Sequence, residues 1–150
     1  MKKPANKYRV APKAERTDPD GVVYASKNEM IRAMELDRLH LAAGWQVTRQ
    51  PIYTLGCPEN VYRADFYVWV GEDDGPMYFE TPTGLIVAHC WVEDVKGFRT
   101  PAFKRHVRLW RKYGTMPLVI LTKQTKGWKR EVILPGSKPT REPRRPKVTP

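Results

Sequence analysis

The segment 100–113 restricts the possible folds most, because its pattern predicts a helix with a marked start, a marked end and two unlike faces. Pro101 stands at the first helical position, and Gly114 follows the last one. At 100° per residue, Phe103, Val107 and Trp110 fall on one narrow arc, which predicts a face that packs on a core. Five basic side chains fall on the opposite arc: Lys104, Arg105, Arg108, Arg111 and Lys112. We expect this second face to contact phosphate groups, with a merely solvated surface as the alternative.

The segments around this helix predict a mixed α/β domain. A first helix should run from Ser26 to about Ala43, because Ser26 and Glu29 have the spacing of a capping box and Gly44 suits a helix end. Its apolar residues spread widely around the helix, which indicates contacts on more than one side and favours a second subunit. Strands are expected at 45–55, 61–70, 85–95, 117–121 and 128–134, with a further short strand at 77–80 that a turn at 82–84 follows.

The 150 residues suit one domain, which we expect to span 21–134, between a flexible basic segment at 1–20 and a basic, proline-rich tail at 135–150. Lys and Arg number 27 against 16 Asp and Glu, a net charge of +11. This excess makes a polyanion, above all nucleic acid, the first partner to consider. The sequence shows no membrane helix, no secretory signal and no disulfide framework, so we expect a cytoplasmic protein.

Two acidic residues and one lysine indicate phosphodiester chemistry. Asp65 stands within an otherwise apolar predicted strand, where a carboxylate is costly unless it is paired or binds a metal. Side chains alternate along a strand, so Asp94 and Lys96 should share one face while Glu93 points to the other. If the two strands are neighbours, Asp65 and Asp94 converge, and a divalent cation such as Mg²⁺ would remove their repulsion.

In these residues the chain resembles the PD-(D/E)xK nuclease superfamily: Asp65 is followed by Asp94-Val95-Lys96, and Glu29 precedes them in the first helix. More narrowly, it resembles the small phage-encoded Holliday junction resolvases over much of its length. The stretches that carry this likeness are 20–29, Gln50-Pro51, 62–66 and 92–97. The resemblance implies a restriction-endonuclease-like αβββαβ core, with a mixed central sheet flanked by helices.

The resemblance also implies a role for each matching residue. A catalytic site would be formed by Glu29, Asp65, Asp94 and Lys96. The metal, Mg²⁺ or in its place Mn²⁺, would be held by the three carboxylates of this set together with the Val95 carbonyl. Gln50 would be an ancillary site residue.

Several of these features also have a structural explanation. Glu29 could serve only the capping box, and an Asp-x-Lys triplet occurs by chance in many chains. The basic tail could serve only solubility. The chain also departs from the strict family motif at Ala64, where a proline is usual, and in the acidic segment 72–74.

The leading hypothesis is a Mg²⁺-dependent, structure-selective DNA endonuclease that resolves four-way junctions by paired phosphodiester hydrolysis. Paired cuts require two sites at a fixed separation, which a homodimer supplies. A general nicking or restriction-type nuclease would use the same residues on ordinary duplex DNA. In a different class, the chain could be a non-catalytic DNA-binding accessory protein with a degenerate nuclease fold. If the chain is phage-encoded, its location would be the host cytoplasm.

Overall fold

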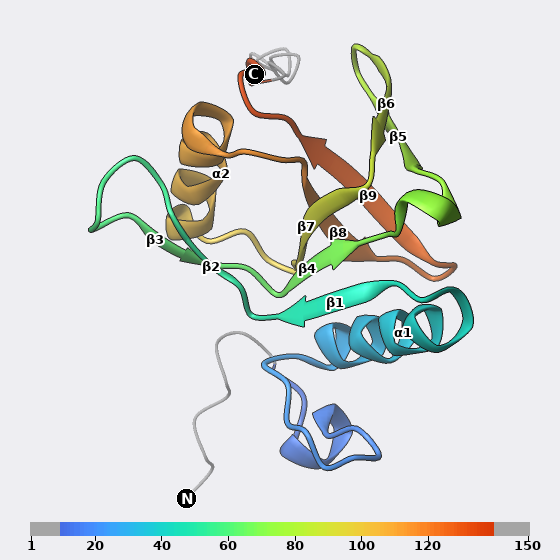
Figure 1. The fold of residues 1–150 in the computed structure, drawn as a ribbon. Helices are drawn as coiled ribbons and strands as arrows, with labels where there is room; N and C mark the ends of the chain where they lie inside the picture. Colours follow the sequence, from blue (N-terminus) through green and yellow to red (C-terminus); the bar gives the residue numbers. More distant parts are fainter. Residues whose placement is uncertain (1–9, 140–150) are drawn as a thin grey trace, which may run out of the picture.

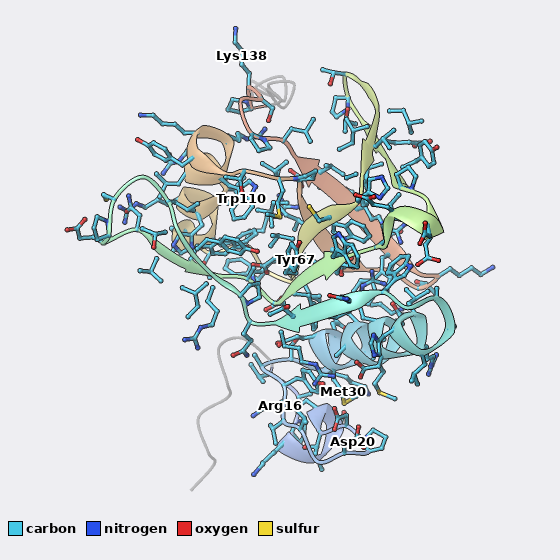
Figure 2. All side chains as sticks on the ribbon, viewed as in Figure 1. Arg16, Asp20, Met30, Tyr67, Trp110 and Lys138 are labelled. Atoms are coloured by element: carbon cyan, nitrogen blue, oxygen red, sulfur yellow. The ribbon has the colours of Figure 1, made fainter. Side chains whose placement is uncertain are left out.

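Two helices cover opposite faces of a five-stranded sheet in the computed structural model, which describes residues 10–139 (Figure 1). Helix α1 (Lys27–Ala43) buries Leu36 in one hydrophobic cluster with the sheet. Helix α2 (Pro101–Tyr113) buries Phe103 and Trp110 in a second cluster, and Figure 2 shows Trp110 between α2 and the strands. The predicted α/β class, with a mixed central sheet and helices beside it, is confirmed.

The central sheet has the strand order β1–β4–β7–β8–β9. Its members are β1 (Gln46–Arg49), β4 (Phe66–Trp69), β7 (Cys90–Val95), β8 (Leu118–Lys123) and β9 (Trp128–Ile133). Strands β7 and β8 are parallel because α2 connects them as a crossover, and the other neighbours are antiparallel. Strand β7 is therefore central, with α1 and α2 above its two faces.

Two small antiparallel sheets lie outside this central sheet. One pairs β2 (Ile52–Thr54) with β3 (Val61–Arg63), and the other pairs β5 (Met77–Thr81) with β6 (Gly84–Ala88). Short 3-10 helices precede α1 and β5: η1 (Lys13–Arg16) and η2 (Glu72–Asp74).

Both long helices begin and end where the sequence predicts. Ser26 caps α1 by accepting a hydrogen bond from the Glu29 amide at 3.1 Å, and Gly44 ends the helix in the left-handed conformation with φ 70°. Thr100 caps α2 in the same way, by accepting from the Phe103 amide at 3.1 Å. The capping box thus fixes Glu29 in the first turn of α1.

Three predicted strands are each divided in two, which corrects the boundaries expected from the sequence. Residues 61–70 form β3 and β4, with Asp65 in the break between them instead of inside one strand. Residues 85–95 divide at His89 into β6 and β7, and residues 45–55 divide into β1 and β2. The cause is a change of pairing partner, since one half of each run joins the central sheet and the other half a small sheet. A run of β-forming residues does not indicate where the strand changes its pairing partner.

The N-terminal segment 1–20 and the tail 135–150 lie partly outside the described residues. Within the described part, η1 contacts α1, and Figure 2 shows Arg16 and Asp20 on the segment below α1 in that view. Asp18 is buried and accepts hydrogen bonds from the Val22 amide at 2.8 Å and the Tyr24 hydroxyl at 2.9 Å. The part of this segment around Asp18 is therefore packed on the domain. Within residues 10–139, no helix has the length and apolar character needed to cross a membrane.

Candidate active site

Asp94 is fully buried on β7, on the side of the sheet that α2 covers. Its Oδ2 accepts a hydrogen bond from the Tyr62 hydroxyl, and its Oδ1 forms an ion pair with the Lys96 ammonium. The predicted placement of Asp94 and Lys96 on one face is therefore confirmed. Oδ1 has no polar partner other than Lys96 among the described residues. Burial raises the pKa of Asp94, and the contacts with Lys96 and Tyr62 oppose that increase.

Asp65 lies next to Asp94, at the break between β3 and β4. The pairing of β4 with β7 sets Phe66 opposite Glu93, which brings the preceding residue, Asp65, to the level of Asp94. The Oδ2 of Asp65 accepts a hydrogen bond from the Val95 amide at 2.7 Å. Burial, followed by the Asp94 carboxylate, raises the pKa of Asp65 to about 7. The two carboxylates therefore converge as predicted, although Asp65 reaches Asp94 from a strand break.

Glu29 faces these carboxylates from the first turn of α1. Its side chain is buried, and its Oε2 accepts a hydrogen bond from the Ala25 amide at 3.2 Å. Burial, followed by the Asp65 carboxylate, raises the pKa of Glu29 to about 7, and Lys96 acts on it in the opposite direction. Glu29 thus has the capping role that the sequence offers and is also an electrostatic neighbour of Asp65 and Lys96.

Lys96 completes a group that we name the Asp94 cluster, which consists of Glu29, Asp65, Asp94 and Lys96. The Lys96 Nζ lies 5.0 Å from the centroid of the Phe103 ring on α2. Burial alone would lower the pKa of Lys96, but the carboxylates of Asp94, Asp65 and Glu29 raise it above its ordinary value. The lysine therefore remains charged beside three acidic groups.

Gln50 and Val95 reach the cluster through their backbones. The Gln50 amide donates to the Asp65 carbonyl at 2.8 Å, while the Gln50 side chain is exposed. Among residues 10–139, Gln50 is the one non-glycine residue with a positive φ, at 49°. Strained backbone of this kind is found at functional sites. Gln50 and Val95 thus hold Asp65 from its carbonyl and from its carboxylate.

Four of the five predicted DNA-binding residues on α2 are exposed: Lys104, Arg105, Arg108 and Lys112. Arg105 also donates to the Asn60 Oδ1 at 2.7 Å. Arg111 is half-buried and donates to the Ser137 Oγ at 2.7 Å, which ties α2 to the segment after β9. Arg111 therefore has a structural contact that the helical wheel does not reveal.

Tyr62 and His106 are site residues that the sequence reasoning missed. The rings of Tyr62 and His106 lie 4.9 Å apart between centroids, at an interplanar angle of 35°. Burial, followed by Arg105, lowers the pKa of His106. In a continuous strand Tyr62 and Asp65 would point to opposite faces, because they are three residues apart. The break at Asp65 allows both side chains to approach Asp94, and nothing in their spacing predicts it.

The carboxylate oxygens of the Asp94 cluster suit a hard divalent cation as ligands. The Asp94 Oδ1 has Lys96 as its one polar partner among the described residues, and burial, followed by the Asp94 carboxylate, raises the pKa of Asp65. Mg²⁺ usually takes one or two protein carboxylates and fills its other positions with water and phosphate. No group of three or more His, Cys, Asp or Glu side chains within residues 10–139 has the arrangement of a metal site. The cluster therefore suits a cation held by two carboxylates better than one enclosed by the protein.

Glu93 lies on the opposite face of β7 from Asp94, as the alternation predicts. It is buried beneath α1, where Arg32 donates to both of its carboxylate oxygens, each at 2.7 Å. The Trp91 indole donates to the same carboxylate at 2.9 Å. Glu93 is thus a fully occupied structural acid, which distinguishes it from its neighbour Asp94.

Comparisons with known proteins identify no relative of this chain: no protein-family model, no curated protein and no solved structure matches it. Functional inference therefore depends on the Asp94 cluster and its surroundings, together with the resemblance visible in the sequence motifs.

Proposed function

We propose that this protein is a Mg²⁺-dependent DNA endonuclease that cleaves branched DNA, with four-way junctions as its preferred substrate. The observation that carries the proposal is the meeting of Asp65, Asp94 and Lys96, with Glu29 beside them. These residues stand in the chain order that the PD-(D/E)xK resemblance associates with catalysis. A chance Asp-x-Lys triplet has no reason to acquire a second carboxylate as a buried neighbour, because such a pair destabilises the fold.

The order of the elements supports the same proposal. Without the two small sheets, the 3-10 helices and β9, the chain reads α1–β1–β4–β7–α2–β8. This is the αβββαβ order of the restriction-endonuclease-like core implied by the resemblance. Strand β4, which follows Asp65, and strand β7, which contains Asp94, are neighbours in the interior of the sheet.

Mg²⁺ would be held by Asp65 and Asp94, with the Val95 carbonyl and Glu29 as the further groups of the proposed site. When bound, the ion polarises a phosphoryl oxygen and lowers the pKa of a bound water. Mn²⁺ would substitute for it, since it prefers similar oxygen ligands.

The protein's own groups would position these carboxylates and stabilise charge. The Tyr62 hydroxyl and the Val95 amide hold Asp94 and Asp65, respectively, which keeps the two acids oriented. The Lys96 ammonium, kept protonated by its acidic neighbours, would stabilise the negative charge that develops on the phosphate in the transition state.

The exposed basic residues of α2 would contact the DNA backbone. Contacts with phosphate carry no information about the base sequence, so such a surface selects DNA by its shape. A homodimer would present two clusters to the two opposed strands of a junction, which paired cutting requires.

Cleavage of three labelled substrates tests the proposal: a four-way junction, a linear duplex and a single strand, each with Mg²⁺ and with EDTA. Metal-dependent paired cuts in the junction alone support it. Equal cutting of the linear duplex would instead identify a general nicking or restriction-type nuclease. Binding without cutting in Mg²⁺ and in Mn²⁺ would identify a DNA-binding accessory protein and overturn the proposal.

A further inference from the structure

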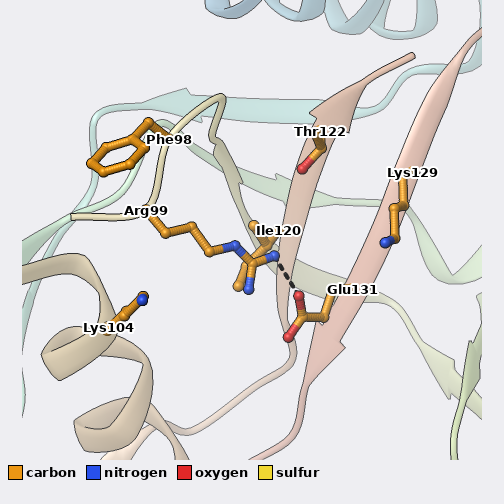
Figure 3. Close-up of a pocket in the computed structure, with 7 residues that line it drawn as sticks. All are labelled: Phe98, Arg99, Lys104, Ile120, Thr122, Lys129 and Glu131. Atoms are coloured by element: carbon orange, nitrogen blue, oxygen red, sulfur yellow. Dashed lines mark hydrogen bonds and ion pairs between the residues drawn. The ribbon is translucent and has the colours of Figure 1, made fainter. Parts of the chain in front are cut away.

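A pocket of about 520 Å³ opens beside the Asp94 cluster, between the loop after β7, helix α2 and strands β8 and β9 (Figure 3). Its wall includes Ile120 of β8, which is the register partner of Asp94. The loop residue Phe98, two positions after Lys96, lines its opposite side. The volume is within the range of about 300–1,000 Å³ that is common for ligand sites. The pocket and the cluster are therefore neighbours on one side of the sheet.

The charged side chains of this pocket favour an anionic ligand. Glu131 is the one acidic residue in its lining, and it forms an ion pair with Arg99. Lys104 from α2 and Lys129 from β9 also line the pocket, and neither belongs to an ion pair within residues 10–139. Two ammonium groups thus remain available, and an ammonium group binds a phosphate as a point charge.

Phe98 gives the same pocket an aromatic surface. Its side chain is 69% exposed, and Figure 3 shows its ring beside Arg99, on the side of the pocket away from β9. Proteins that bind unpaired nucleotides combine basic groups along the backbone with aromatic rings on which the bases stack. Phe98 and the two lysines provide both parts around one cavity.

We propose that this pocket receives one unpaired nucleotide of the DNA substrate, with its base stacked on Phe98 and its phosphate bound by Lys104 and Lys129. This inference rests on the proposed nuclease function and adds a residue that determines its specificity. A branch point supplies an unpaired base at lower cost than an intact duplex, in which each base must first be unstacked. The strand that enters the pocket would pass beside Asp94, because Ile120 lies next to both.

Binding of a short single-stranded deoxyoligonucleotide that carries one 2-aminopurine tests this inference in EDTA, where cleavage does not interfere. Stacking quenches 2-aminopurine fluorescence. Phe98→Ala should weaken binding about ten-fold and abolish the quenching, whereas Phe98→Trp should retain both. The matched control is Tyr78→Ala, which removes an aromatic side chain of similar exposure, 60%, from β5 outside the pocket. This control should bind and quench as the unchanged protein does.

The two lysines should affect binding in a different way. Lys104→Ala and Lys129→Ala should weaken binding mainly at low salt and reduce its salt dependence, since each removes one phosphate contact. Phe98→Ala should leave the salt dependence unchanged. Equal thermal midpoints for all variants would show that each is folded.

Two results would overturn the proposal of a nucleotide pocket. In the first, Phe98→Ala binds the oligonucleotide and quenches its fluorescence as the unchanged protein does. In the second, Tyr78→Ala loses as much binding and quenching as Phe98→Ala. Cleavage assays separate this outcome from failure of the nuclease proposal. Binding that depends on Phe98, without cleavage of any DNA, would support the nucleotide pocket and overturn the proposed nuclease function. If the protein cleaves junctions in preference to duplexes and Phe98→Ala leaves that preference unchanged, the nuclease function is supported and the nucleotide pocket is overturned.

Discussion

Asp94 illustrates, at the scale of single residues, how a buried carboxylate is held inside a core. An acid removed from water loses its hydration and must recover interactions from the protein. Tyr62 supplies a hydrogen bond to one oxygen, and Lys96 supplies the opposite charge to the other. Among the described residues, the oxygen that faces Lys96 has that ammonium as its one polar partner, so each oxygen of the buried acid is stabilised by a neighbouring side chain.

Replacing Tyr62 with Phe should destabilise the fold by about 1–3 kcal/mol, because it leaves a buried carboxylate oxygen without its donor. Urea unfolding measures the change. Tyr53→Phe is the matched control, since Tyr53 packs against the same hydrophobic cluster and should cost less. Equal losses in the two variants would contradict the importance of the Tyr62 contact.

Glu29 should make stability depend on pH in the absence of metal. Its pKa of about 7 in the folded protein lies above the ordinary value of 4.5, so folding favours the neutral acid. Its contribution is complete below about pH 4.5 and is lost as the pH rises through 7. Glu29→Gln cannot ionise, so its stability relative to the unchanged protein should increase across this range by up to about 3 kcal/mol.

Urea unfolding in EDTA at several pH values measures this difference. Glu72→Gln, at an exposed position in η2, is the control and should show no comparable trend. A difference between Glu29→Gln and the unchanged protein that stays constant from pH 4.5 to 7 would contradict the proposed environment of Glu29.

Prediction from sequence at the residue scale succeeds where the argument is local. Alternation along β7 separates Glu93 from Asp94 and Lys96, and the structure confirms that separation. Tyr62 could not be found in this way, because its approach to Asp94 depends on a strand break that the adjacent sequence does not predict.

At the scale of whole elements, a buried ion pair attaches helix α1 to strand β7. Arg32 is 6% exposed and Glu93 is 2% exposed, and two hydrogen bonds of 2.7 Å join them. The pair fixes the position of α1 over the sheet and thereby the position of Glu29 one turn earlier. It acts through geometry, since a buried pair stabilises a fold little relative to well-packed apolar residues.

Glu93→Gln should therefore cost up to about 3 kcal/mol, because it removes one acidic partner of the buried Arg32 charge and leaves Glu35 as the other. Replacing both Arg32 and Glu93 with Met should cost less than the sum of the single changes. Denaturant unfolding of the three variants measures this coupling. Asp37→Asn, which breaks the exposed pair with Arg49, is the control and should cost at most about 1 kcal/mol. Additive losses for Arg32 and Glu93 would contradict a buried, coupled pair.

Both long helices could be predicted because their signals are local: caps, a terminal glycine and, in α2, a two-faced pattern. The strands were less predictable. Residues 61–70 and 85–95 each read as one strand, yet each changes its pairing partner part of the way along. The short strand at 77–80 and the turn at 82–84 could be predicted, and they form part of the β5–β6 pair. Pairing is decided by distant segments, so the changes of partner and the break at Asp65 were not visible in the sequence.

The whole molecule combines a positively charged exterior with an acidic interior site. The chain carries a net charge of +11, and α2 exposes basic residues beside the pocket that contains Phe98. Such a field attracts a polyanion, while a divalent cation would balance the carboxylates of the Asp94 cluster. In the proposed function, Asp94 would serve cleavage and the exposed basic residues of α2 would serve binding.

The most direct test is to measure cleavage and binding of a four-way junction by Asp94→Asn. Cleavage in Mg²⁺ should fall about a thousand-fold or more, because a proposed metal ligand is lost. Junction binding in EDTA should be unchanged or tighter, since one negative charge is removed. Asp73→Asn, which changes an exposed acid in η2, should alter neither measurement. Cleavage by Asp94→Asn at the rate of the unchanged protein would contradict the proposed role of Asp94.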